Sequence, residues 1–207
     1  MDVCNLDDFK IAFKKLDVYI DDAINEGNSL FEESGPLIVR AIGGFALIYH
    51  NLRFGGVTAD VDDVCEIPLC YKDLIKKVGH DLGIPEDWLN DHSQSTLSDN
   101  YGKWEPVDWE LKHICLYVLN TRELLIDKIG WAEKNLSGVS MTDRDILKDY
   151  NDFLGILWKL GIEYDTVEML REKLSSLGID LNEYPSVSAQ IQREISDDGI
   201  NWPDGHI

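Results

Sequence analysis

The sequence predicts an α+β protein, because strand-like segments gather in the first part of the chain and amphipathic helical segments fill the rest. Residues 37–42 (LIVRAI) and 113–119 (HICLYVL) are short, apolar and rich in β-branched side chains, which is typical of buried strands. We expect a small mixed β-sheet core with an N-terminal helix in residues 1–119, a helical region in 120–200 and a tail in 201–207.

Apolar periodicity and turn residues give the elements of the core in chain order. Residues 6–26 carry apolar side chains at steps of three and four, which predicts an amphipathic helix. After the strand at 37–42, Gly43 and Gly44 predict a turn. The segments that follow are a short helix at 45–52, a strand around 61–67, a helix that ends near Gly83 and the strand at 113–119.

The second half of the chain is predicted to be helical throughout. Asn120 and Glu123 have the spacing of a capping box for a helix that runs to about residue 134. Three further helices are expected, with N-caps at Thr142, Asp165 and Ser186, and they span roughly 143–159, 165–177 and 186–197.

The charge balance narrows the classes of partner. The chain has 19 basic and 39 acidic residues and a formal charge of -20, so its field repels phosphate backbones and favours a cation or a basic protein partner. The four cysteines form no paired CxxC motif, the amino terminus lacks signal-peptide order, and no apolar stretch approaches a membrane span. These patterns predict a cytoplasmic protein without a membrane role.

Asp60 and Asp62 are the most informative candidates for chemistry. On a strand, side chains two residues apart point to one face, so the two carboxylates are expected to hold one Mg²⁺ ion together. Gly43 and Gly44 precede Asp60 by fifteen intervening residues, and a glycine pair between a strand and a helix lets backbone N–H groups approach phosphate closely. Metal and phosphate would then meet at one place, as phosphoryl transfer requires.

The strand, the glycine pair, the helix and then Thr58-Ala59-Asp60-Val61-Asp62 resemble the signature of the polymerase-beta nucleotidyltransferase superfamily. The subgroup that the chain resembles is the AbiEii-like minimal nucleotidyltransferases, which include toxins of type IV toxin–antitoxin systems. The resemblance covers roughly residues 37–160. It implies Mg²⁺-dependent transfer of a nucleoside monophosphate from an NTP to an RNA or protein acceptor, and an antitoxin as a further partner.

The resemblance also implies roles for single residues. Gly43, Gly44 and Thr58 would contact the nucleotide, and Asp60 and Asp62 would bind the metal. Two later positions match the family by their order in the chain.

Lys128, in Leu124-Leu125-Ile126-Asp127-Lys128, would contact the triphosphate, and Asp145 would help to activate the acceptor hydroxyl. Two ordinary roles compete with these assignments. Lys128 is also consistent with a solvated or snorkelling side chain on an amphipathic helix. Asp145 is also consistent with an acidic residue that stabilises the first turn of a helix.

The sequence departs from the family pattern in ways that leave a second function open. The residue after the acidic pair is usually apolar, whereas here it is Asp63. The third carboxylate of the superfamily falls equally well on Asp108 or Glu110. The alternative to an active enzyme is therefore a catalytically inactive protein of the same fold that uses its acidic surface to bind a basic protein.

Overall fold

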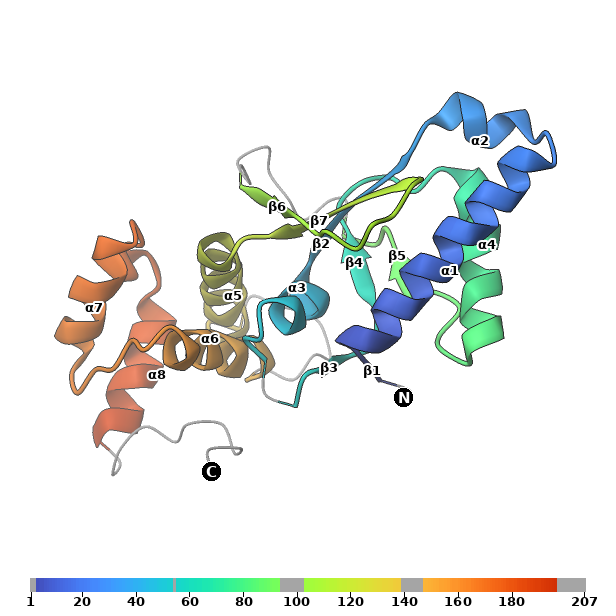
Figure 1. Ribbon diagram of the computed structural model, residues 1–207. Coiled ribbons are helices and arrows are strands. Elements are labelled where there is room, and N and C mark those ends of the chain that lie inside the picture. Colours follow the sequence, from blue (N-terminus) through green and yellow to red (C-terminus); the bar gives the residue numbers. More distant parts are fainter. Residues whose placement is uncertain (1–2, 54, 94–102, 139–146, 197–207) are drawn as a thin grey trace. The chain divides into compact units, whose positions relative to one another are not determined.

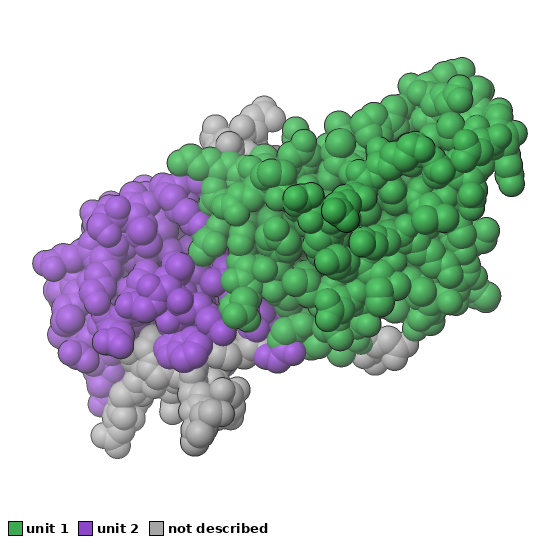
Figure 2. Space-filling view, viewed as in Figure 1, with its two compact units in different colours: residues 1–51, 56–121 green, residues 52–55, 122–207 purple. Residues whose placement is uncertain are grey.

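The computed structural model describes residues 3–53, 55–93, 103–138 and 147–196 (Figure 1). The chain forms two compact units, coloured separately in Figure 2. Unit 1 comprises residues 1–51 and 56–121, and unit 2 comprises residues 52–55 and 122–207. Residues 52–55 thus leave unit 1 and join unit 2, an excursion that the sequence does not reveal. Taken together, the described residues form helices and a mixed sheet, so the predicted α+β class is confirmed.

The core of unit 1 is a five-stranded sheet in the order β5-β4-β2-β7-β6. β2 lies at its centre, parallel to β7 and antiparallel to β4, while β5 is parallel to β4 and forms one edge. The described strands of this sheet are β2 (Leu37–Ile42), β4 (Val61–Asp63), β5 (Leu89–Asn90), β6 (Trp104–Pro106) and β7 (Ile114–Leu119). A separate two-stranded sheet pairs β1 (Cys4–Asn5) with β3 (Val57–Thr58).

The helices of unit 1 are α1 (Leu6–Asn25), α2 (Ser29–Ser34), α3 (Gly43–Tyr49) and α4 (Leu69–Leu82). α1 begins at a capping box, in which the side chain of Asn5 accepts the N–H of Asp8 and the carboxylate of Asp8 accepts the N–H of Asn5. Gly83 ends α4 with a left-handed φ of 67°. α1 and α4 pack side by side (Figure 1), which buries the apolar stripe that the sequence predicts for α1.

Aromatic side chains from three parts of unit 1 form its core. Phe13 of α1 meets Trp88 at 5.0 Å between ring centroids, and Phe9 meets Phe45 of α3 at 5.5 Å. The indole N–H of Trp88 donates to the carbonyl of Ile75 at 3.0 Å, so its polar atom is satisfied although the side chain is fully buried. This packing holds α1, α3 and α4 against the sheet that contains Asp62.

Two predicted elements of unit 1 have different bounds. The strand expected at 61–67 ends at Asp63, because the carboxylate of Asp63 accepts the N–H of Cys65 at 2.9 Å and turns the chain. The helix expected at 45–52 is α3, which begins at Gly43 and ends at Tyr49, so the glycine pair forms its first turn and not a separate one.

Unit 2 is helical, as the sequence predicts. Its described helices are α5 (Thr121–Leu136, the first residue belonging to unit 1), α6 (Lys148–Lys159), α7 (Val167–Ser176), a 3₁₀ turn η1 (Leu181–Glu183) and α8 (Pro185–Ser196). Glu133 of α5 accepts the N–H groups of Ser186 and Val187, which satisfies the amino terminus of α8. Thr166, and not Asp165, caps α7 by accepting the N–H of Met169. The expected N-cap Thr142 and the tail 201–207 lie outside the described residues.

Within the described part of the chain, every helix is too short or too polar to span a bilayer.

Candidate metal and nucleotide site

Asp62 lies in β4, whereas Asp60 lies in the short link between β3 and β4, directly before β4 begins at Val61. Val61 and Asp63 are both fully buried, whereas Asp60 and Asp62 are partly exposed. Alternation along the strand therefore places Val61 and Asp63 on its buried face and Asp62 on the opposite face. The carboxylate of Asp60 accepts a hydrogen bond from Asn90, which is paired with Asp62. A common strand face for Asp60 and Asp62 stays a prediction, because only Asp62 lies within β4.

Gly43 lies directly beside the carboxylate of Asp62. Antiparallel pairing of β2 with β4 sets Ile42 opposite Asp62, so the next residue begins α3 next to the acidic strand. A β-carbon at Gly43 would lie 3.1 Å from Oδ2 of Asp62, and its φ of +60° is one that L-residues rarely adopt. The φ value thus favours glycine here, and an added β-carbon would require Oδ2 of Asp62 to shift by a few tenths of an ångström. Gly44 follows in the first turn of α3.

Thr58 lies in the other sheet of unit 1. It is 8% exposed in β3 and pairs with Cys4 of β1. It therefore stands two residues before Asp60, in a different sheet from Asp62.

Asn90 is a site neighbour that the sequence analysis missed. The parallel pairing of β4 with β5 sets Asn90 opposite Asp62, and its side-chain Nδ2 donates to Oδ2 of Asp60 at 3.3 Å. Its Oδ1 accepts the N–H of His92 at 3.1 Å, and the residue is 6% exposed. A two-residue strand is too short to show periodicity, so the only sequence signal was the apolar pair Trp88-Leu89 after the end of α4.

Neither candidate for a third carboxylate accompanies the acidic pair. Asp108 and Glu110 follow β6, which is three strand positions away from β4, a separation of about 14 Å at the usual spacing of strands. Among the described residues, no three His, Cys, Asp or Glu side chains gather in a way that could hold a metal ion. The position beside Asp62 on the neighbouring strand belongs to the amide of Asn90.

Asp63 carries its carboxylate to the opposite, buried face of the same strand. Its Oδ1 accepts the N–H groups of Arg40 at 2.8 Å and Cys65 at 2.9 Å, while its buried Oδ2 has no hydrogen-bond partner among the residues that the structure describes. Burial raises the pKa of Asp63 to about 6, and the backbone hydrogen bonds oppose this shift only in part. The departure noted in the sequence is thus a buried acid that does not share the face of Asp62.

Lys128 belongs to unit 2, where it forms a buried ion pair. Its side chain is 3% exposed, and its Nζ lies 2.7 Å from Oδ1 of Asp149 and 3.6 Å from Oδ2 of Asp152. The description as a solvated lysine is therefore wrong. Contact with a triphosphate stays a prediction. Asp145 lies outside the described residues.

The partners of Lys128 extend into a network within unit 2. Oδ2 of Asp149 accepts a hydrogen bond from Asn135 of α5 at 3.1 Å. Asp152 binds Arg53, whose Nη2 lies 2.8 Å from its Oδ2. Because Arg53 lies in the excursion at 52–55, this ion pair ties that segment to α6. The network has the charge pairing that a buried lysine requires.

The residues of unit 1 fit a magnesium ion held together with a substrate phosphate. Mg²⁺ is commonly bound through one or two carboxylates, while phosphate oxygens and water complete its six ligands. Asp60 and Asp62 would supply the carboxylates, and the bare backbone at Gly43 leaves space next to Oδ2 of Asp62 that a side chain would fill.

Comparison of the chain with protein-family models, with curated proteins and with solved structures finds no match. The resemblance to AbiEii-like nucleotidyltransferases therefore stays a prediction from the motifs. A functional assignment depends on the geometry around Asp60 and Asp62.

Proposed function

We propose that this protein is a nucleotidyltransferase that uses Mg²⁺ to transfer a nucleoside monophosphate from an NTP to a hydroxyl acceptor. The observation that carries the proposal is the contact between the acidic pair and the glycine turn. Asp62 points away from the buried face of β4, Asp60 directly precedes that strand, and Gly43 leaves room at Oδ2 of Asp62. A toxin role in a toxin–antitoxin pair is part of the same proposal and rests on the motif resemblance.

In the proposed reaction the acceptor oxygen forms a bond to the α-phosphorus of the NTP. The bond between that phosphorus and the oxygen that bridges to the β-phosphate breaks, pyrophosphate leaves with the bonding electrons, and the hydroxyl proton passes to water. Bound Mg²⁺ supplies charge neutralisation for the transferred phosphoryl group and the pyrophosphate. Asp60 and Asp62 position the reactants, and the amide of Asn90 orients Asp60.

Calorimetry with each NTP, in the presence and absence of Mg²⁺, tests the proposal directly. We expect wild-type protein to bind at least one NTP only with Mg²⁺, and the Asp60→Asn, Asp62→Asn double variant to lose that binding. The matched control is Asp7→Asn with Asp22→Asn, which removes the same charge from α1. Wild type without metal-dependent NTP binding, or an active-site variant that binds like wild type, would refute the proposal.

The amide of Asn90 favours a second candidate. A nucleotidyltransferase fold that lacks a third carboxylate is also consistent with a protein that has lost catalysis and binds a basic partner through its acidic surface. The formal charge of -20 supports such a partner. Labelled-NTP transfer separates the two candidates, because an inactive protein would bind NTP and Mg²⁺ weakly or not at all and would transfer no label.

A further inference from the structure

A cavity of about 330 Å³ opens between α4 and β5, on the outer side of Asn90. Its apolar floor consists of Ile67, Ile75 and Leu89, all buried. The rest of its lining is polar or charged: Lys72, Lys76, Glu86, Asp87, Asn90, Asp91 and His92. The size and the apolar floor with a polar rim are those of a site for one small group.

Asn90 connects this cavity with the candidate metal site. It lines the cavity, and its side chain donates to Oδ2 of Asp60 at 3.3 Å. The acidic pair thus has one flank at Gly43, next to Asp62, and another flank at β5, next to Asp60.

These two sides of the acidic pair match the two sides of the phosphorus at which an in-line displacement takes place. In phosphoryl transfer the attacking oxygen and the leaving oxygen lie on opposite sides of the phosphorus. If the triphosphate lies against the backbone at Gly43, the pyrophosphate leaves on that flank. The acceptor then approaches from the flank of Asn90, where the cavity opens.

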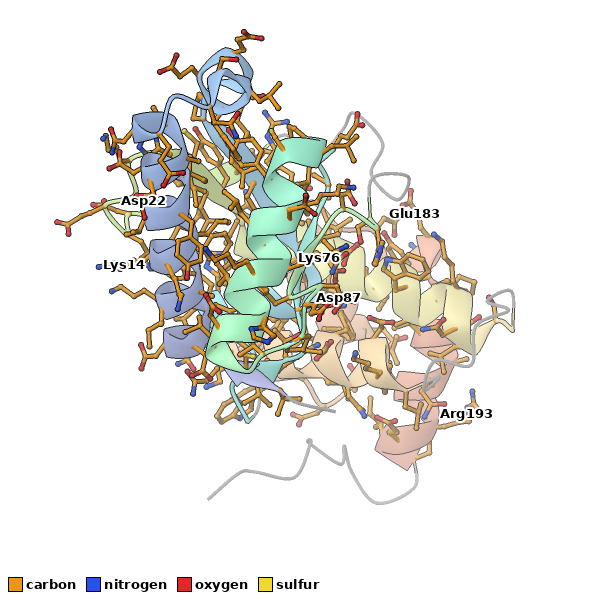
Figure 3. All side chains as sticks on the ribbon, turned by 90° about the vertical axis from the view of Figure 1, so that its right-hand side faces the viewer. Lys14, Asp22, Lys76, Asp87, Glu183 and Arg193 are labelled. Atoms are coloured by element: carbon orange, nitrogen blue, oxygen red, sulfur yellow. The ribbon has the colours of Figure 1, made fainter. Side chains whose placement is uncertain are left out.

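The charge on the rim of the cavity favours one class of acceptor over another. Lys72 is paired with Asp91 at 2.9 Å, so its charge is balanced within the protein. The remaining charged side chains of the lining are one lysine, Lys76, against Glu86 and Asp87. Figure 3 shows Lys76 on α4 and Asp87 on the segment before β5 on the same face of unit 1. A net negative rim on a chain of charge -20 repels a phosphate backbone and attracts a basic segment.

We propose that this cavity, the acceptor pocket, binds a hydroxyl-bearing side chain of a basic polypeptide segment and presents it to the nucleotide. The inference rests on the proposed nucleotidyltransferase function and names its acceptor. The serine, threonine or tyrosine oxygen would form the new bond to the α-phosphorus, and pyrophosphate would leave as described above.

The test uses the full chain with Mg²⁺ and NTPs labelled at the α-phosphate. One set of acceptors is lysine-rich peptides with a single central Ser, Thr or Tyr. A second set carries Glu in place of Lys, and a third acceptor is bulk tRNA. We expect label on the lysine-rich peptides, little on the glutamate-rich peptides and none on tRNA.

Adding positive or negative charge at the rim should change KM for the basic peptide in opposite directions. Glu86→Lys with Asp87→Lys should raise KM for the basic peptide about tenfold, and Lys76→Glu should lower it about threefold. Asp22→Lys with Glu26→Lys makes the same charge change at an exposed position of α1 and at its exposed C-cap, and should alter KM less than about twofold. Calorimetry should show unchanged Mg²⁺-dependent NTP binding in every variant, which also establishes that each is folded.

Label on tRNA and not on peptides would overturn the acceptor inference and leave the proposed function standing. Rim variants that match the α1 control would overturn it as well, as would Mg²⁺-dependent NTP binding without label on any peptide. Absence of Mg²⁺-dependent NTP binding in wild type would instead remove the proposed function, and this inference with it.

Discussion

Oδ2 of Asp62 lies 3.1 Å from the position that a β-carbon would take on Gly43. The contact joins the end of β2 to the acidic strand β4, because Ile42 and Asp62 are paired across the two strands. In the proposed site, a side chain at Gly43 would push Oδ2 of Asp62 away by a few tenths of an ångström and occupy the space next to it.

Gly43→Ala should therefore impair nucleotide binding more than stability. The φ of +60° costs about 1 kcal/mol for alanine, and the new methyl group displaces Asp62. Gly56→Ala is the matched control, because Gly56 also has a φ of +60° but has nothing within 4 Å of an added β-carbon. We expect similar losses in urea denaturation for both variants. Only Gly43→Ala should weaken Mg²⁺-dependent NTP binding in calorimetry, and equal binding by the two variants would contradict the role of this contact.

Asn90→Asp should make the folded protein more sensitive to Mg²⁺. The change removes the donor to Asp60 and places a third carboxylate beside Asp60 and Asp62. Without metal the three carboxylates repel one another, and with Mg²⁺ they bind the cation together. Thermal unfolding should show a lower Tm in EDTA and a larger rise with Mg²⁺ than in wild type.

Asn25→Asp is the control for that comparison. The amide of Asn25 donates to Asp21 on α1 at 3.2 Å, so the same chemical change occurs next to a carboxylate outside the candidate site. An equal response of both variants to Mg²⁺ would show that the metal acts through overall charge and not at Asp60.

Lys128→Met should destabilise the protein strongly. The substitution leaves the fully buried carboxylate of Asp149 without its cation, which costs about 3–5 kcal/mol. Urea denaturation of Lys128→Met, Asp149→Leu and the double variant measures the coupling. If the main role of Lys128 is to pair with Asp149, the double variant should recover much of the loss. Additive losses would instead point to a separate role for Lys128.

The titration of Asp63 should make the protein less stable as the pH rises from 4 to 8. Its pKa in the folded protein is about 6, against 3.8 as the ordinary value, so the folded state holds the proton more tightly. The resulting stabilisation is complete below about pH 4, is lost as the pH passes through 6, and amounts to about 2–3 kcal/mol.

Asp63→Asn isolates this contribution, since an amide has similar shape and does not ionise. In urea denaturation with EDTA, the variant and wild type should be about equally stable at pH 4. From there to pH 8, the free energy of unfolding of the variant should rise relative to that of wild type. A constant difference over that range would mean that Asp63 does not titrate as burial predicts.

Local patterns in the sequence were sufficient for several features of the fold and the site. The amphipathic spacing in α1 and the β-branched run in β2 predicted both elements within one residue of their observed bounds. The position of Asp62 on the face of β4 opposite the buried Val61 and Asp63 follows the period of a strand in the same way. Each of these features depends on a period of 3.6 or 2 residues along one segment, which the order of residues displays directly.

Features that depend on pairing between distant segments were not predictable. The strand β5 has two residues, and no period in the sequence signals that Asn90 lies opposite Asp62. For the same reason, Asp108 and Glu110 were equally plausible as a third carboxylate until the strand order separated them from Asp62.

The sequence by itself determined the α+β class, the acidic charge and the face of its strand on which Asp62 lies, because composition and short-range periodicity carry that information. Only the tertiary structure decided which side chains meet that face. It brought Gly43 to Asp62 and Asn90 to Asp60, and it buried Lys128 against Asp149. Such contacts follow from strand register and helix packing, which join residues far apart in the chain and leave no local pattern.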